Sequence, residues 1–500
     1  MTGGEWLGAL QTALVVVLLV LCATGIVPVI AAAISFLAIP FHAFINHYRD
    51  ARPYLPRVVV VVPAWNEGAV IGASIDRLMS LEYPGDSLRV YVVDDASTDS
   101  TPDVVREKER QYRGAVRHLR REQGGQGKAH TLNHGIAEAM SDDWMEALLI
   151  MDADVIYSPD SLHKMTRHLA DPSVGAVSAY IREGSRDKNY LTRFIGLEYV
   201  LSQPAARRAQ NVLGAQACLA GGAQLHSRAN LEALGGKVDT STLAEDTITT
   251  FETQLRGHKV VFEPHAVVLA EEPRTIDALW KQRLRWARGN VSVTARYASV
   301  WFRPWRAPSL GSFAFGVVWF SLWLLPVAMV LSSVGLVGLL LLQSPLATDV
   351  FRVLWIAAAL TFVFTLALGA QLDGPLTVRA WRELLTFPGI LSMLVMLTAL
   401  FPRLIEVDLP GLFGARLSES ALFWLTLAVY VWIPVSMLGA VLARRLERTR
   451  VGRVLSPALL YLVGYGSLLC AITFDSYIKE IRHADARWDK TVKTGRVTMS

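Results

Sequence analysis

Two aspartates separated by one residue, Asp152 and Asp154, are the first side chains whose type and spacing suggest chemistry. Paired carboxylates on a turn can hold a hard divalent cation, and that cation can neutralise a diphosphate group. The pattern alone is weak, because many such pairs only cap helices or form turns. Here it follows the apolar run 148–151, so the sequence predicts a metal site at the end of a buried strand.

A second acidic pair, Glu245 and Asp246, lies in the segment 243–247, just before a helical stretch. In isolation the better interpretation is a capping arrangement, since acidic residues are favoured at helix starts. The functional alternative makes Asp246 a general base that takes a proton from a hydroxyl group, an effect worth about 10²–10⁴-fold in rate.

The segment 280–289 combines aromatic, basic and amide side chains at helical spacing. Gln282, Arg285 and Trp286 stand at positions i, i+3 and i+4, so they share one face of a helix. Arginine can bind phosphate oxygens through two parallel hydrogen bonds, and a tryptophan ring offers a flat apolar surface for a sugar. A basic helix beside a membrane, with tryptophan at the interface, is the alternative, and the segment alone favours it.

The sequence between these candidates predicts an α/β sheet that would position them. The runs 57–63, 88–93 and 148–151 are apolar and rich in β-branched residues, which is typical of strands buried on both faces of a parallel sheet. A helix is predicted from about Ala69, and several N-cap candidates in 97–101 predict another. Strands that alternate with helices indicate an α/β fold.

Polar residues follow each of the three predicted strands: Asn66-Glu67, Asp94-Asp95 and Asp152-Ala153-Asp154. The carboxyl ends of strands in an open α/β sheet are where ligands bind. One such cluster needs no special explanation, because a strand must end in something polar. Three of them in register predict a shared site.

Charge and hydropathy divide the chain into a soluble segment between membrane segments. Hydrophobic residues make up 52% of the 500 residues and the mean hydropathy is +0.33, which is too apolar for a soluble protein. Trp6 to Tyr48 contains no Asp, Glu, Lys or Arg, whereas 49–306 reads as an ordinary soluble domain. The basic residues behind the net charge of +5 flank the apolar blocks without interleaved aromatics, so we expect no nucleic-acid partner. The three cysteines show no disulfide framework.

In order along the chain, these motifs resemble the processive family-2 glycosyltransferases, which include cellulose, hyaluronan, chitin-type and poly-N-acetylglucosamine synthases. The resemblance covers about Arg57 to Val293 and rests on six motifs: Pro63-Ala64-Trp65-Asn66-Glu67, Val93-Asp94-Asp95, Gly127-Lys128-Ala129-His130-Thr131-Leu132-Asn133, Asp152-Ala153-Asp154, Glu245-Asp246 and Gln282-x-x-Arg285-Trp286. The stretch 280–289 is most similar to the poly-N-acetylglucosamine synthases. One departure is Ala244, where the family usually has Thr or Ser.

The resemblance implies a donor site and a catalytic base. The nucleotide and its diphosphate would contact six residues: Trp65, Glu67, Asp95, Lys128, Asp152 and Arg285. Asp154, together with Asp152, would bind Mg²⁺ or Mn²⁺ at the diphosphate. Asp246, beside Glu245, would be the base, because an inverting transfer needs one carboxylate on the acceptor side.

The resemblance also implies an acceptor site. The growing glycan would be held by Gln282, Arg283 and Trp286. Gly221 and Gly222, which we expect between a strand and the helix from about Arg228, would form a loop on the acceptor side, where glycine permits close approach by a sugar. A plain turn is the alternative for the two glycines, and the sequence leaves both open.

The apolar blocks predict a membrane part on either side of the soluble domain. Residues 1–50 are expected to form two crossings broken near Thr24-Gly25, with one crossing plus an interfacial helix as the alternative. Residues 51–300 would be the cytosolic catalytic domain and 301–478 the C-terminal membrane helices. Four blocks in this last part are long enough to span: 312–342, 351–371, 420–442 and 455–475. The block 385–402 is short and bounded by prolines, so it is expected to be re-entrant or interfacial.

The tail, residues 479–500, resembles the gating loop of cellulose synthases, in which Thr491 and Lys493 would close over the nucleotide. A basic disordered terminus is the alternative. A gating tail must be cytosolic, which requires an even number of crossings after Arg306, and four crossings satisfy this. That count conflicts with the positive-inside bias, because it places five arginines outside: Arg444, Arg445, Arg448, Arg450 and Arg453.

The sequence as a whole predicts a GT-A-type (Rossmann-like) mixed α/β sheet domain inserted in an α-helical transmembrane bundle of the plasma (inner) membrane. The expected activity is inverting, metal-dependent transfer from a UDP-sugar, with UDP-N-acetylglucosamine as the expected donor, into a β-linked polysaccharide exported through the bundle. The expected partners are the donor, the glycan acceptor, membrane lipid and an accessory export protein. A non-processive transferase that makes a glycolipid or lipid-linked sugar is the alternative. A transporter or scaffold with a degenerate nucleotide domain would have lost the carboxylates, which are all present.

Overall fold

The computed structural model describes residues 3–44, 50–403, 408–412, 417–484 and 497. The chain divides into two compact units. The sheet unit comprises three stretches: Ser35–Arg274, Arg288–Gly316 and Asp485–Ser500. The helical unit comprises three others: Met1–Ile34, Thr275–Ala287 and Val317–Ala484.

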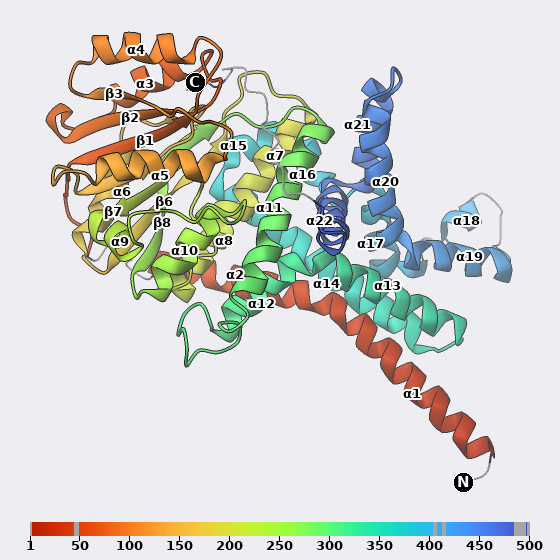
Figure 1. Cartoon of the computed structure of the whole chain (residues 1–500). Helices are drawn as coiled ribbons and strands as arrows, with labels where there is room; N and C mark the ends of the chain where they lie inside the picture. Colours follow the sequence, from red (N-terminus) through yellow and green to blue (C-terminus); the bar gives the residue numbers. More distant parts are fainter. Residues whose placement is uncertain (1–2, 45–49, 404–407, 413–416, 485–496, 498–500) are drawn as a thin grey trace. The chain divides into compact units, whose positions relative to one another are not determined.

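The sheet unit is built on an eight-stranded mixed sheet with the order β3-β2-β1-β4-β7-β6-β8-β5 (Figure 1). Its strands, in chain order, are β1 (Val58–Ala64), β2 (Leu88–Asp94), β3 (Val116–Arg120), β4 (Ala147–Ile150), β5 (Ile156–Tyr157), β6 (Val174–Glu183), β7 (Gln224–Ser227) and β8 (Lys259–Ala270). β1 pairs in parallel with β2 and β4, and β2 pairs in parallel with β3, whereas β7 is antiparallel to β4. The expected mixed α/β sheet is confirmed, and the polar ends of β1, β2 and β4 share one edge.

Helices cover both faces of this sheet because successive strand residues point in opposite directions. Val58, Val60 and Val62 pack on the side of α3 (Ile71–Met79), α4 (Thr101–Gln111) and α6 (Ser161–Thr166). Val59 and Val61 pack on the side of α5 (Lys128–Ala139) and α9 (Arg228–Ala233). All five valines are almost fully buried, as the unbroken apolar run predicts for an inner strand.

Four further helices belong wholly or partly to the sheet unit: α7 (Tyr190–Val200), α8 (Ala206–Leu213), α10 (Glu245–Leu255) and α11 (Ile276–Arg296). The last of these begins in the helical unit and ends in the sheet unit, because the boundary between the units falls after Ala287. A single helix therefore belongs to both units.

Helix α5 lies unusually close to the sheet at Gly135. A Cβ atom at this position would lie 2.6 Å from Cγ1 of Val61 and 2.8 Å from Cγ2 of Val93. The helix can adopt this position only because residue 135 has no side chain. The contact matters for the site, since Lys128 is the first residue of the same helix.

The N-terminal apolar segment consists of α1 (Gly3–Ala23), a 3₁₀ turn (Thr24–Ile26) and α2 (Val27–Phe44). The expected break near Thr24 is present, but Trp6–His42 forms one candidate membrane span rather than the two that we expected. At the break, the Thr24 hydroxyl donates to the carbonyl oxygen of Leu21 (2.6 Å), and a single 3₁₀ turn joins α1 to α2.

The C-terminal apolar blocks form one long helix, three bent pairs and one short helix. Helix α14 (Leu346–Leu372) is long and apolar enough to cross a membrane alone. Three pairs reach that length only together: α12 (Phe313–Trp323) with α13 (Leu325–Leu341), bent by 75°; α19 (Glu419–Tyr430) with α20 (Trp432–Glu447), bent by 63°; and α21 (Gly452–Val463) with α22 (Tyr465–Ile481), bent by 94°. The block that we expected to be too short to span is α17 (Ile390–Leu400).

Small residues allow α1 to pack closely on α13 in the helical unit. A Cβ atom at Gly335 would lie 2.6 Å from Sγ of Cys22, and one at Gly338 would overlap the side chain of Leu18. Small residues at close helix crossings are typical of membrane bundles.

Replacing Gly135 by Ala should destabilise the sheet unit, because the new methyl group would collide with Val61 and Val93. Overpacking of this kind costs about 1–3 kcal/mol. We expect a lower melting temperature of the purified protein in detergent, measured by tryptophan fluorescence. Gly85→Ala is the control, since a Cβ there meets nothing within 4 Å. Equal melting temperatures for the two variants would contradict the proposed role of Gly135.

Candidate active site

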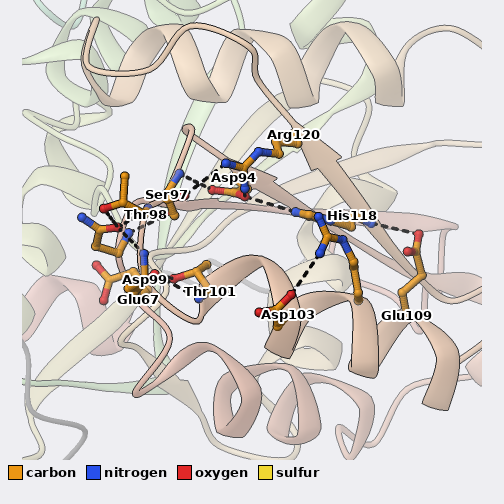
Figure 2. Close-up of polar contacts among 12 residues, drawn as sticks. Glu67, Asp94, Ser97, Thr98, Asp99, Thr101, Asp103, Glu109, His118 and Arg120 are labelled. Atoms are coloured by element: carbon orange, nitrogen blue, oxygen red, sulfur yellow. Dashed lines mark hydrogen bonds and ion pairs between the residues drawn. The ribbon is translucent and has the colours of Figure 1, made fainter.

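The loops that follow β1 and β2 are joined by hydrogen bonds centred on Asn66. This residue has a left-handed backbone (φ 54°), and its Oδ1 accepts a hydrogen bond from the amide of Thr98 (2.9 Å). The next amide, of Glu67, donates to Oγ1 of Thr101 at 2.8 Å (Figure 2). The two predicted nucleotide contacts in this loop, Trp65 and Glu67, are therefore held on a fixed backbone, and the Trp65 ring is 36% exposed.

Asp94, at the end of β2, is a structural carboxylate. It is fully buried, and it accepts hydrogen bonds from the amide of Ser97 (2.8 Å) and from Nη1 of Arg120 (2.7 Å), with Nε2 of His118 at 3.3 Å (Figure 2). Burial would raise the pKa of Asp94, but the hydrogen bonds from His118 and Ser97 and the charge of Arg120 outweigh burial and lower it. Asp94 therefore stays ionised and fixes the loop that begins at Asp95.

Asp95, a predicted nucleotide contact, is also buried and orders the segment that leads into α5. Its carboxylate pairs with the guanidinium of Arg121 and accepts a hydrogen bond from the amide of Gly125 (3.0 Å). Arg121 was not among the predicted site residues. It directly follows β3, a short strand whose alternating apolar and basic residues gave too weak a signal to predict it.

Lys128 lies where four segments of the sheet unit meet. Its Nζ forms an ion pair with Oδ1 of Asp152, donates to the carbonyl oxygen of Gly221 (3.2 Å) and lies 4.0 Å from Oε1 of Glu245. These partners come from the turn after β4, the loop before β7 and the first residue of α10. The structure thus brings together residues that the sequence analysis assigned to donor, acceptor and catalysis.

The glycine pair brings its loop close to two of these carboxylates. A Cβ atom at Gly221 would lie 3.1 Å from Oδ2 of Asp246, and one at Gly222 would lie 2.9 Å from Oδ2 of Asp152. The carbonyl oxygen of Gly222 accepts a hydrogen bond from the Tyr157 hydroxyl (3.2 Å). The expected order of strand, glycines and helix is wrong, because the strand β7 follows the glycines. Its polar sequence, Gln-Leu-His-Ser, gave little strand signal.

Glu245 and Asp246 are the first two residues of α10, so the acidic pair begins the helix instead of preceding it. Burial and the negative charge of Asp246 raise the pKa of Glu245 to about 7, although the charge of Lys128 lowers it. Burial would lower the pKa of Lys128, but Asp152 and Glu245 outweigh burial and raise it, so the ammonium stays charged. Asp246 accepts a hydrogen bond from the amide of Thr247 (2.7 Å).

The turn that carries Asp152 and Asp154 can supply carboxylate oxygens to a metal ion but not a complete ligand set. It is fixed by Ser74, whose hydroxyl donates to the carbonyl oxygen of the buried Ala153 (2.6 Å). Within the described part of the chain, no group of three or more His, Cys, Asp or Glu side chains could hold a metal ion. One or two carboxylates fit Mg²⁺ or Mn²⁺ where substrate phosphates complete the coordination.

Three predicted acceptor residues, Gln282, Arg283 and Trp286, and the predicted diphosphate contact Arg285 lie on α11, in the helical unit. Gln282 and Arg285 are partly buried, Arg283 is buried, and Trp286 is 41% exposed. The guanidinium of Arg283 lies 4.0 Å from the centroid of the Trp286 ring, a cation–π arrangement that supports the exposed ring from one side. Thr491 and Lys493, the predicted gating residues, lie outside the described residues.

Comparison with known proteins finds a family that matches the part of the chain containing the sheet and the start of α11. Residues 56–289 match the family described as "Glycosyltransferase like family 2". The β-monoglucosyldiacylglycerol synthase of Synechocystis sp. is 34% identical over 250 residues, which are 50% of this chain and 50% of that protein. The poly-β-1,6-N-acetyl-D-glucosamine synthase of Staphylococcus aureus is 27% identical over 243 residues, which are 48% of this chain and 56% of that protein.

A solved structure extends the similarity beyond the sheet unit. The mannosyltransferase PcManGT of Pyrobaculum calidifontis, in complex with GDP-Man and Mn²⁺, aligns with a TM-score of 0.53 and 26% identity over 74% of this chain and 99% of its own. The chain covers only 50–62% of the length of the first curated relatives that it matches. The expected GT-A-type fold is confirmed, while the role of each site residue stays a prediction.

Replacing Glu245 by Gln should change how stability depends on pH. Folding raises the pKa of Glu245, so the ionised carboxylate costs stability above its ordinary pKa, and the cost grows until about pH 7. We expect Glu245→Gln to melt near the wild-type temperature at pH 5 and above it at pH 8. Thermal unfolding across this range is the measurement, with the exposed Glu232→Gln as a control that should not show the rise. A difference in melting temperature between Glu245→Gln and wild type that does not change with pH would contradict the raised pKa of Glu245.

Proposed function

Residues 56–289 form a glycosyltransferase family 2 domain, and from this premise we propose that the protein is a membrane transferase that extends a β-linked polysaccharide from a UDP-sugar. The convergence of Lys128, Asp152, Glu245 and Asp246 beside a glycine loop carries the proposal. A transfer site needs cationic groups for the donor diphosphate and a carboxylate for the acceptor hydroxyl, and this cluster contains both.

Asp246 is the proposed base. As the acceptor hydroxyl oxygen forms its bond to the anomeric carbon, its proton passes to Asp246 and the bond to the diphosphate breaks, with the electron pair leaving on UDP. Gly221 leaves space for an acceptor beside Asp246, since a side chain there would meet the Asp246 carboxylate. The neighbouring negative charge of Asp246 raises the pKa of Glu245, which favours a neutral Glu245 beside the base.

Asp154 and Asp152 are the proposed ligands of Mg²⁺ or Mn²⁺, and the mannosyltransferase structure was determined with Mn²⁺. When bound, the ion would neutralise the diphosphate leaving group. Asp152 pairs with Lys128 in this structure, so Lys128 holds that carboxylate in place with a positive charge. With the donor bound, the same ammonium would be available to the diphosphate.

Two products fit this site, a polysaccharide and a glycolipid. Polymer extension is supported by the Gln282, Arg285 and Trp286 motif and by the relationship to a poly-β-1,6-N-acetyl-D-glucosamine synthase. UDP-N-acetylglucosamine is therefore the proposed donor. Glycolipid synthesis is the second candidate, because a β-monoglucosyldiacylglycerol synthase is 34% identical over half of the chain.

We propose that the arginines at the end of α20 lie on the cytosolic side with the catalytic domain. Arg444 and Arg448 both pair with Asp277 at 2.8 Å, within the helical unit. Asp277 follows Ala270, the last residue of β8, so closely that the chain between them reaches at most about 25 Å. That is less than the hydrocarbon core of about 30 Å.

The tail also returns to this side, since Val497 forms an antiparallel bridge with Ser185 inside the sheet unit. Both ends of the α21–α22 pair would then be cytosolic, so this pair, bent by 94°, would be re-entrant. Because α12–α13 and α14 return the chain to the cytosolic side before α19, the α19–α20 pair, bent by 63°, would be re-entrant as well. This arrangement removes the conflict between a cytosolic tail and the positive-inside bias.

The function is tested with membranes that contain the protein, incubated with one radiolabelled UDP-sugar at a time and Mg²⁺ or Mn²⁺. Polymer extension predicts a high-molecular-weight product that a linkage-specific hydrolase degrades. Label that extracts into organic solvent would favour the glycolipid candidate. If no UDP-sugar yields either product, the proposal is wrong.

Asp246→Asn should remove turnover, with a loss of at least about 10²-fold, because the neutral amide cannot accept the hydroxyl proton. UDP binding, measured by calorimetry on the purified protein, should stay within a few-fold of wild type. Loss of UDP binding together with activity would show that Asp246 is a donor ligand and not the base.

The topology is tested by labelling single cysteines with a membrane-impermeant maleimide, after replacement of Cys22, Cys218 and Cys470. Arg450→Cys should react only from the cytosolic face, like the exposed Asp103→Cys in the sheet unit. Gln343→Cys, between α13 and α14, should react from the opposite face. If Arg450→Cys and Gln343→Cys were labelled from the same face of the membrane, the re-entrant arrangement would be wrong.

A further inference from the structure

Five side chains of the helical unit hold the first turns of α11, the helix that carries the predicted acceptor residues. We call them the α11 anchor: Asp277 and Trp280 on α11, Arg444 and Glu447 on α20, and Asp475 on α22. None of them belongs to the predicted donor, metal or acceptor sites. They come from three helices that lie far apart in the sequence.

Glu447 caps the start of α11 from another helix. Its Oε1 accepts a hydrogen bond from the amide of Ile276 (2.8 Å), and its Oε2 accepts one from the amide of Asp277 (3.0 Å). These amides have no partner within their own helix, and a carboxylate there also interacts favourably with the helix dipole. The cap fixes α11 along its axis, because a shift of the helix would break both bonds.

Asp277 and Trp280 fix the rotation of the same helix. Oδ1 of Asp277 accepts a hydrogen bond from Nε of Arg444 (2.9 Å), and the Arg444 guanidinium also lies 4.5 Å from the centroid of the Trp280 ring. The indole Nε1 of Trp280, which is 2% exposed, donates to Oδ2 of Asp475 (2.8 Å). A buried indole has a single donor, so this bond defines one orientation of the ring.

We propose that the α11 anchor positions the face of α11 that carries Gln282, Arg285 and Trp286. Use of the acceptor, which is expected to contact Gln282 and Trp286, then depends on the anchor more strongly than activation of the donor, which is expected to contact only Arg285 on this helix. This inference rests on the proposed transferase function. Gln282, Arg285 and Trp286 follow Trp280 within two turns of one continuous helix, so a rotation at Trp280 is passed on to them.

The size of the expected effect follows from helix geometry. A rotation of about 20° moves a side chain at a radius of roughly 5 Å by about 2 Å. A displacement of about 1 Å at a reacting group can cost on the order of 10²-fold in rate. Loss of one anchoring bond should therefore reduce acceptor use strongly without unfolding the protein.

The test removes the same hydrogen bond from both ends. Trp280→Phe keeps an aromatic ring and loses the donor, and Asp475→Leu loses the acceptor. Each should lower kcat/KM for the acceptor by about 10-fold or more through a higher KM. The kcat/KM of the double variant should be no lower than that of the less active single variant, because both substitutions remove the same hydrogen bond. Asp475→Asn retains an acceptor oxygen and should restore most of the activity.

Slow hydrolysis of the UDP-sugar by water, measured without acceptor, distinguishes a loss of acceptor positioning from general damage to the enzyme. Hydrolysis and UDP affinity should fall clearly less than transfer to the acceptor in every variant, because Arg285 is the only predicted donor contact on α11. Phe474→Leu, an exposed neighbour on α22, should change neither reaction. Parallel loss of hydrolysis and transfer, additive effects in the double variant, or no effect on the acceptor would each overturn the proposal.

A measurement that needs no activity distinguishes failure of this inference from failure of the function. Amide hydrogen exchange in 276–286 should be faster in Asp475→Leu than in wild type and close to wild type in Asp475→Asn. Unchanged exchange overturns the anchor even if the enzyme is active. A wild-type protein that neither transfers nor hydrolyses any UDP-sugar overturns the function itself.

Discussion

The site depends on one partly buried cation among carboxylates, the ammonium group of Lys128. Asp152 and Glu245 lie around it, and Asp246 lies beside the same glycine loop. Carboxylates withdrawn from water repel one another, and each would favour its neutral form unless a positive charge stood nearby. Burial and the negative charge of Asp246 raise the pKa of Glu245, although the charge of Lys128 lowers it. A donor that brings its own metal ion adds the positive charge that the site lacks.

Several other features of the sheet unit place the ammonium group of Lys128 beside these carboxylates. Lys128 reaches the carboxylates because α5 starts beside the polar edge of the sheet, and α5 can lie that close because residue 135 is glycine. Asp94 and Asp95 hold the segments that lead into this helix through Arg120 and Arg121. Polar residues at the neighbouring strand ends therefore have two kinds of role: some fix the loops, and others are the proposed contacts of the substrate.

Local pattern predicted the strands that carry the site, because an unbroken run of valines has few structural alternatives. It also predicted the polar strand ends, since β1, β2 and β4 are parallel neighbours. It did not predict β7, whose four residues are mostly polar. It favoured two crossings in the N-terminal segment, where the helical stretch Trp6–His42 is one candidate span by length and composition. It could not show that Lys128 pairs with Asp152, because such a pair depends on how α5 and β4 come together in three dimensions.

The contacts of the α11 anchor could not be predicted from the sequence. Glu447 and Asp277 are separated by 170 positions, and no periodicity relates them. In the sequence, Asp475 is an acidic residue that directly follows a mostly apolar stretch of α22. An ionisable residue in such a segment is costly unless it has a partner, so its presence already calls for a functional or structural reason. The hydrogen bond to Trp280 supplies that partner, and it connects the membrane helices to the helix on which the acceptor motif lies. Within the helical unit, the position of α11 thus depends on side chains from two other helices that the acceptor motif itself does not contain.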